Sequence, residues 1–187
     1  LYTSHFEDFY WFDEQNDKVL LAVADCSGYG VPGAMISVVC YGALHEAVRT
    51  VGLSDTSKIL NLTQELVAKR FELENEKMPD GMDISLCVID LASNKIQFSG
   101  ANNSMFLVRG NELIELKGDK QTIGNIDVVE PFTSQEIQGQ KNDAIYLFSD
   151  GYANQLGGEK GKKLKTTSLK DELVKISAIS MSEQLTV

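Results

Sequence analysis

Histidine is scarce in this chain, which has only His5 and His45 among its 187 residues. Zinc and copper sites rely on histidine and cysteine ligands, so a metal site in this chain would have to use oxygen ligands. The three cysteines, at positions 26, 40 and 87, are odd in number and lack the spacing of metal-binding motifs. They predict reduced thiols of a cytoplasmic protein rather than a disulfide framework.

Long hydrophobic runs and an excess of positive charge are also missing. No apolar run approaches the ~18 residues that suggest a transmembrane helix, and the first residues lack the basic and apolar regions of a signal peptide. Lys and Arg number 17 against 27 Asp and Glu, which gives a net charge of −10. This balance argues against a nucleic-acid binder, since such proteins present a basic face. We expect a cytoplasmic domain without membrane insertion, with the cytosolic domain of a membrane-bound sensor as the alternative.

The patterning predicts one domain over residues 1–187 in which a helical region interrupts a series of strands. A helix is expected from Pro32 to about Gly52, and Ser54 or Asp55 can cap a second one. A third is expected over 168–179, and strands over 5–12, 18–24, 84–91, 95–99, 105–109, 113–117, 130–137 and 144–148. This order implies the α+β class, and we favour antiparallel sheets packed on each other with helices outside.

The most informative segment is Ala24-Asp25-Cys26-Ser27-Gly28-Tyr29-Gly30-Val31-Pro32-Gly33. An apolar run ends at Asp25, and a loop of small residues leads into the first helix. The pattern places a carboxylate at the end of a buried strand, where the backbone can approach a ligand closely, and so indicates a metal or a phosphate site. A nucleotide-binding loop is disfavoured because the Walker lysine and the Gly-x-Gly-x-x-Gly spacing are absent.

Other aspartates occupy similar settings. Asp8 lies in the first expected strand, Asp150 ends residues 145–149 and precedes Gly151, and Asp80 and Asp83 lead into another strand. Carboxylates at strand ends present hard oxygen ligands on rigid elements. Together with the scarcity of histidine, they favour Mg²⁺ or Mn²⁺ over zinc or copper.

Several segments resemble, in order along the chain, the SpoIIE-type branch of the metal-dependent PPM (type 2C) serine/threonine phosphatases. They are Asp8-Phe9-Tyr10-Trp11, the loop from Ala24 to Ala34, Asp80-Gly81-Met82-Asp83, Gly100-Ala101-Asn102-Asn103 and Phe148-Ser149-Asp150-Gly151-Tyr152. The resemblance implies a PPM-type β-sandwich of antiparallel sheets flanked by helices. It also implies a hydrolase with two Mn²⁺ or Mg²⁺ ions, which lower the pKa of a bridging water so that hydroxide attacks phosphorus.

The resemblance also assigns roles to individual residues. By position, Asp8 and Asp25 would hold or bridge the two metal ions, the backbone carbonyl of Cys26 would be a further ligand, and Asp150 would complete the second site. Asp8, Asp25 and Asp150 are therefore the implied catalytic residues. A third, weaker ion is left open, with Asp80 or Asp83 as its ligand.

The expected reaction is hydrolysis of phosphoserine or phosphothreonine on a bacterial signalling partner, such as an anti-sigma antagonist. The chain would be the output domain of a longer sensor, and a homodimer is left open. Tyr29 stands where the family usually has histidine, and Asn154 where most members have aspartate. The family's final aspartate pair and last core strand are not found before Val187, so that strand is expected to be missing. These departures keep a second hypothesis open: a degenerate, non-catalytic phosphatase-like domain that binds a signalling partner.

Overall fold

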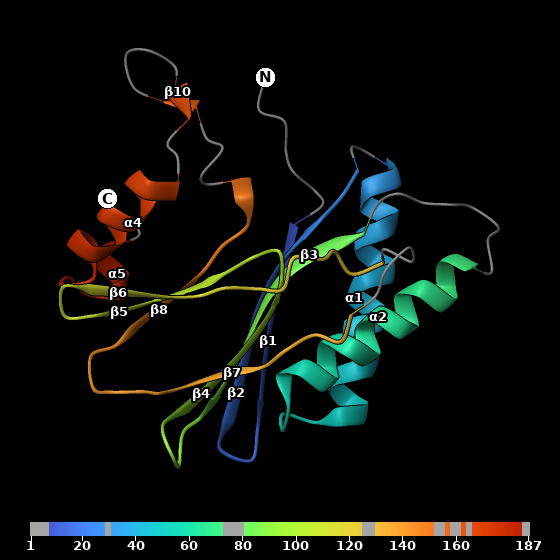
Figure 1. Ribbon diagram of the computed structural model, residues 1–187, viewed down its shortest axis with the longest axis horizontal. Helices are drawn as coiled ribbons and strands as arrows, with labels where there is room; N and C mark the ends of the chain where they lie inside the picture. The colour runs from blue at the N-terminus through green and yellow to red at the C-terminus, as the bar shows by residue number, and fades with distance from the viewer. Residues whose placement is uncertain are drawn as a thin grey trace.

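Two antiparallel sheets and the helices outside them make up the part of the chain that the computed structural model describes, residues 8–28, 31–72, 81–124, 130–151, 156–157, 162–163 and 166–184. From one side to the other, the layers are a helix pair, a five-stranded sheet, a three-stranded sheet and a C-terminal helix (Figure 1). The predicted α+β class and helix-flanked sandwich are confirmed.

The larger sheet has the strand order β1-β2-β3-β4-β7, and the smaller sheet has the order β6-β5-β8. Asn16 and Asp17, with φ of 49° and 61°, form the two-residue turn between β1 and β2, as a tight hairpin requires. The larger sheet contains β1 (Asp8–Gln15), β2 (Lys18–Cys26), β3 (Met82–Asp90), β4 (Lys95–Ala101) and β7 (Gln135–Gln138). The smaller sheet contains β5 (Met105–Arg109), β6 (Glu112–Leu116) and β8 (Ala144–Leu147), and a separate pair is formed by β9 (Leu156–Gly157) and β10 (Lys162–Lys163).

Two long helices cover the outer face of the larger sheet: α1 (Val31–Val51) and α2 (Thr56–Glu72). On the far side of the sandwich α4 (Thr166–Ile176) packs Leu169 and Leu173 against Phe106 and Val108 of β5. The short α5 (Met181–Gln184) follows it. None of the helices described is both long and apolar enough to span a bilayer.

Alternation along β2 decides which side chains reach which layer. Leu20, Ala22 and Ala24 are fully buried under the helices. Since successive strand residues point to opposite faces, Val23 and Asp25 lie on the face turned toward the smaller sheet. The core between the sheets is built around Cys87, Ile96, Phe98, Met105, Leu107 and Leu116.

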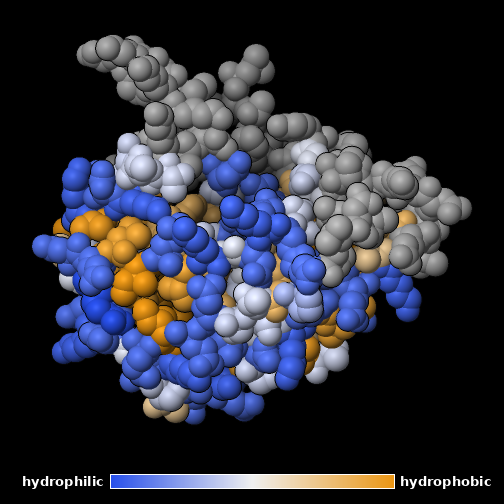
Figure 2. Space-filling view, viewed as in Figure 1, coloured by the Kyte–Doolittle hydropathy of each residue, from blue (hydrophilic) through white to orange (hydrophobic). Residues whose placement is uncertain are grey.

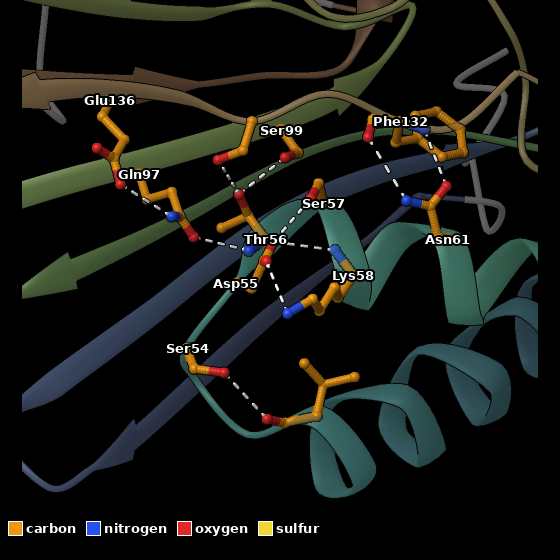
Figure 3. A network of polar contacts seen from close by, with 12 residues as sticks. Ser54, Asp55, Thr56, Ser57, Lys58, Asn61, Gln97, Ser99, Phe132 and Glu136 are labelled. Carbon is orange, nitrogen blue, oxygen red and sulfur yellow. Dashed lines mark hydrogen bonds and ion pairs between the residues drawn. The ribbon is translucent and has the colours of Figure 1, made fainter.

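Asp55 is the residue that caps α2 (Figure 3). Its Oδ1 accepts hydrogen bonds from the Ser57 hydroxyl at 2.7 Å and the Lys58 amide at 3.1 Å. Of the two caps predicted from the sequence, the structure selects this one, because the Ser54 hydroxyl donates to the carbonyl of Val51 instead.

Buried hydroxyls then fasten the start of α2 to β4 (Figure 3). The Thr56 hydroxyl is hydrogen-bonded to the Ser99 hydroxyl at 2.8 Å, and the Thr56 amide donates to Gln97 Oε1 at 2.8 Å. Thr56 and Ser99 are both fully buried. A buried polar pair is tolerated here because its hydrogen-bonding groups have partners.

Several predicted elements differ in their bounds. The strand expected over 5–12 continues to Gln15, and residues 5–7 lie outside the described part of the chain. The strand expected over 130–137 begins only at Gln135, because the preceding segment bonds to side chains: the Phe132 amide donates to Asn61 Oδ1 and the Thr133 amide to Asp119 Oδ2. The helix expected over 168–179 spans Thr166–Ile176, and the Ser180 hydroxyl just before α5 donates to Glu183 Oε2 at 2.7 Å.

Candidate functional site

Three aspartates lie in a row across the larger sheet. Asp8 of β1 is the register partner of Asp25 of β2, and Asp25 is the register partner of Asp83 of β3. Directly opposed residues of antiparallel strands point to the same face of the sheet. The row therefore faces the smaller sheet at one end of the sandwich. The three residues come from the first strand, the loop-flanked second strand and the third strand, just as the sequence singled them out.

Asp150 reaches this row from the other sheet. It follows β8 by three residues, and it forms a side-chain hydrogen bond with Asp25. Its neighbour Ser149 donates a hydrogen bond from Oγ to Asp8 Oδ2 at 2.7 Å. The segment after β8 thus closes over both Asp8 and Asp25, and the structure brings together Asp8, Asp25, Asp83 and Asp150.

The pKa of Asp25 reflects the closeness of the other three aspartates. Burial, the negative charges of Asp8 and Asp150, the hydrogen bond with Asp150 and the charge of Asp83 together raise the pKa of Asp25 to about 7, and burial contributes most. A carboxyl that is half-buried among like charges holds a proton more tightly than a free one. The pKa of about 7 means that Asp25 keeps its proton at mildly acidic pH in the metal-free fold.

Asp83 has polar neighbours as well as acidic ones. Burial raises its pKa, the charge of Asp150 acts in the same direction, and hydrogen bonds from Asn102 and Thr122 lower it. The Asn102 Nδ2 group and the Thr122 hydroxyl both donate to Asp83 Oδ1, each at 2.8 Å. These donors stabilise the charged form of a carboxylate that the surroundings otherwise disfavour.

Cys26 contributes no side chain to the site. As the last residue of β2 it points to the face opposite Asp25, where it is 2% exposed. A hydrogen bond with the Cys40 thiol, together with burial, raises the pKa of the Cys26 thiol far above its usual range. A buried, protonated thiol is a poor nucleophile, which leaves the backbone as the part of Cys26 that can act here.

Three residues discussed from the sequence, Asp80, Tyr29 and Asn154, lie outside the described residues. Three others had no assigned role and are found at the site: Ser149, Asn102 and Thr122. Ser149 and Asn102 stand inside the motifs that carry the family resemblance, which is the signal that could have marked them. Thr122 has no local signal, because it reaches Asp83 only through tertiary structure.

Apolar side chains continue the face on which the carboxylates lie. They line a groove of about 450 Å³, and the outermost of them, Tyr10, is 81% exposed. The residues that border the groove are Tyr10, Trp11, Phe12, Leu21, Ala22, Val23, Ile145 and Leu147. The side chains of Trp11 and Ala22 lie on the opposite face of the sheet, toward the helices. Elsewhere on the molecule Figure 2 likewise shows apolar residues reaching a surface that is mostly hydrophilic. The aspartates at this end of the sandwich therefore lie next to an apolar groove.

The chemical type of the ligand atoms at this site is suited to a hard divalent cation. It consists of carboxylate oxygens from rigid strand ends, which Mg²⁺ and Mn²⁺ prefer, and the repulsion that raises the pKa of Asp25 is what a cation would relieve. Among the described residues, however, no three Asp, Glu, His or Cys side chains converge closely enough to hold an ion. In the metal-free fold Asp8 is hydrogen-bonded to Ser149, and Asp25 to Asp150.

The chain has relatives of known family and structure. A sequence model described as "Stage II sporulation protein E (SpoIIE)" matches residues 15–185. The SiaA-PP2C domain of Pseudomonas aeruginosa is 30% identical, with a TM-score of 0.87 over 96% of this chain and 70% of that one. A comparison with curated proteins finds no match.

Two more distant structures show the same fold. The RsbU and RsbW domains of Rv1364c from Mycobacterium tuberculosis share 19% identity, with a TM-score of 0.72 over 95% of this chain and 48% of that one. A structure of RsbX in complex with magnesium shares 16% identity, with a TM-score of 0.58 over 93% of this chain and 81% of that one.

Proposed function

The chain belongs to the SpoIIE family of PP2C-type phosphatase domains, and on that premise we propose that it is a metal-dependent protein serine/threonine phosphatase. The observation that carries the proposal is the gathering of Asp8, Asp25 and Asp150 at one end of the sandwich, where the two neighbouring charges help to raise the pKa of Asp25 to about 7. A site that concentrates negative charge to this degree is suited to bind cations, because bound cations offset the repulsion.

The ligands of the proposed ions come from the two sheets. Asp8 and Asp25 would hold or bridge two ions, the carbonyl of Cys26 would add a backbone oxygen, and Asp150 would complete the second site. Asp83, and Asp80 beside it in the sequence, are proposed for a third and weaker ion. The magnesium complex of RsbX, which has the same fold, supports Mg²⁺ or Mn²⁺ as the ions.

The proposed reaction is hydrolysis of a phosphoserine or phosphothreonine monoester. When bound, two divalent cations neutralise the phosphate dianion and lower the pKa of a water molecule that attacks phosphorus. The contribution of the chain itself is to hold the carboxylates in place: β1 and β2 align Asp8 with Asp25, and Ser149 orients Asp8 through its hydrogen bond. The buried thiol of Cys26 takes no part, so no covalent phosphoenzyme is proposed.

The proposed substrate is a phosphorylated bacterial signalling protein, such as an anti-sigma antagonist, and the proposed location is the cytoplasm. The structure of joined RsbU and RsbW domains supports this context, since there a relative of the same fold is part of a multidomain protein. We likewise propose that this domain is the output domain of a longer sensor.

The test is phosphate release from a phosphoserine peptide by EDTA-treated protein with and without added Mn²⁺. We expect turnover only with the metal, and we expect Asp25→Asn to lower kcat at saturating Mn²⁺ by at least about 100-fold, because it removes a ligand charge from the site. Cys87→Ala, which changes a buried residue of the inter-sheet core, is the matched control and should keep the metal dependence.

Equal turnover in EDTA would contradict the two-metal mechanism. A chain that neither binds Mn²⁺ in calorimetry nor turns over substrate would instead support the non-catalytic, partner-binding alternative that Tyr29 and Asn154 motivate, whereas tight binding of two ions would argue against that alternative.

A further inference from the structure

We infer that Asn102 and Thr122 are positioning residues, which hold Oδ1 of Asp83 so that its Oδ2 is presented to a divalent cation. The inference rests on the proposed function, because it concerns the third ion of the same site. It goes further by assigning roles to two residues that are not themselves acidic.

Asn102 lies beside Asp83 because it occupies the next position in the row formed by Asp8, Asp25 and Asp83. The register between β3 and β4 pairs Ile84 with Ala101, so the next pair in the same register is Asp83 with Asn102. Asn102 follows the last residue of β4, and its φ of 55° turns the chain there. Its amide donates to the carbonyl of Asp119 at 2.8 Å. The backbone on both sides of this carboxamide is therefore fixed.

Thr122 is held opposite Asp83 by a separate contact. Its neighbour Ile123 exchanges two backbone hydrogen bonds with Met82, at 2.8 and 3.0 Å. A Cβ at Gly81 would overlap the carbonyl of Ile123, so this close approach of the two segments depends on a glycine at that position. The segment that carries Thr122 is thus held against the start of β3, next to Asp83.

The three side chains form a closed triangle. Asn102 Nδ2 donates to Asp83 Oδ1 at 2.8 Å and to Thr122 Oγ1 at 2.9 Å. Because the Thr122 oxygen accepts from Asn102, its own proton is directed to Asp83 Oδ1, at 2.8 Å. Both hydrogen bonds to the carboxylate end on the same oxygen. Such an arrangement fixes the rotation of the carboxyl group and leaves its second oxygen as the one that can bind a cation.

Partners that orient a ligand typically change metal affinity by 10- to 100-fold when they are removed. The expected effect is largest for the weakest ion, which is the one assigned to Asp83, and smaller for the other two, because Asp83 is the register partner of Asp25. Metal binding itself is the measurement, so the test does not rely on turnover.

The experiment measures Mn²⁺ binding to the EDTA-treated protein by isothermal titration calorimetry, with the melting temperature in EDTA as a second readout. Asn102→Gly removes the carboxamide but suits the left-handed backbone, and Thr122→Val removes the hydroxyl at nearly constant shape. We expect each to weaken the weakest Mn²⁺ step by about tenfold, with smaller changes in the tighter steps. Thr122→Ser, which restores the hydroxyl, is expected to bind like the wild type.

Asn94→Gly is the matched control, because Asn94 is also an asparagine at positive φ, 55°, in the turn after β3. It should leave every Mn²⁺ step unchanged. If Asn102→Gly and Thr122→Val bind Mn²⁺ as the wild type does, the inference is overturned while the proposed function stands, whatever happens to the melting temperature. A wild-type chain that binds no Mn²⁺ overturns the proposed function and this inference with it.

Discussion

The hydroxyl of Ser149 donates a hydrogen bond to Asp8 Oδ2 at 2.7 Å, although 141 positions separate the two residues in the chain. Asp8 begins the edge strand of the larger sheet, and Ser149 follows the edge strand β8 of the smaller one. The bond therefore joins the two sheets at the point where the carboxylates gather. Through this bond Ser149, which is not itself a proposed metal ligand, fixes the orientation of the proposed ligand Asp8.

Removing this hydroxyl should weaken metal binding more than it weakens the fold. We expect Ser149→Ala to raise the Mn²⁺ concentration for half-maximal phosphopeptide hydrolysis by about tenfold, because Asp8 loses the partner that orients it. The measurement is an Mn²⁺ titration of the initial rate. Ser149→Thr keeps the hydroxyl and should resemble the wild type, whereas an unchanged titration for Ser149→Ala would show that the bond does not matter to the site.

The stability of the metal-free protein should fall as pH rises. The pKa of Asp25 is about 7 in the folded chain, above its ordinary value of 3.8. Between these values the folded state binds one more proton than the unfolded state, so the free energy of unfolding decreases with increasing pH. We expect a loss of roughly 1–3 kcal/mol from pH 5 to pH 8, less than the full shift because Asp25 is only half-buried.

Urea denaturation in EDTA at the two pH values measures this loss. Asp25→Asn carries no titrating group at the position and should flatten the dependence, with a stability above that of the wild type at pH 8. A wild-type protein that is more stable at pH 8 than at pH 5 would contradict the prediction.

Cys26 should be replaceable. Its thiol is buried against Cys40, on the face of β2 opposite Asp25, and its pKa is raised far above the usual range. We therefore expect Cys26→Ala to keep Mn²⁺-dependent turnover within about threefold while it lowers the free energy of unfolding by about 1 kcal/mol through lost packing. The matched control is Cys40→Ala, which removes the partner thiol. Loss of turnover in Cys26→Ala alone would argue for a chemical role of the sulfur.

The hydroxyl of Thr56 should matter to stability. It is fully buried and bonded to the Ser99 hydroxyl at 2.8 Å, so Thr56→Val removes a buried hydrogen bond, although Ser99 keeps its bond to the Thr133 carbonyl. We expect a loss of about 1 kcal/mol in chemical denaturation. Ser54→Ala, two residues earlier, removes an exposed hydroxyl that bonds to Val51, and its cost should stay within about 0.5 kcal/mol. Similar costs for the two variants would contradict this view of the network.

Local patterns were enough for most of the elements. The short apolar run that ends at Asp25, and Pro32 with the helical spacing after it, predicted β2 and the start of α1, because such patterns are properties of neighbouring residues. They failed where distant groups compete for the backbone. The amides of Phe132 and Thr133 bond to Asn61 and Asp119 rather than to a strand, and no local pattern contains that information.

The sequence by itself determined the class of fold and, through its motifs, the family. It also determined that side-chain ligands for a metal ion would be carboxylate oxygens, since the aspartates and the scarcity of histidine are visible in it. It also placed Asp25 at the end of a buried strand. Only the tertiary structure decided which carboxylates meet. Strand register aligned Asp8, Asp25 and Asp83, and the packing of the second sheet brought Asp150 and Ser149 to them. Register and sheet packing depend on contacts between residues far apart in the chain, so they emerge only when the chain is folded.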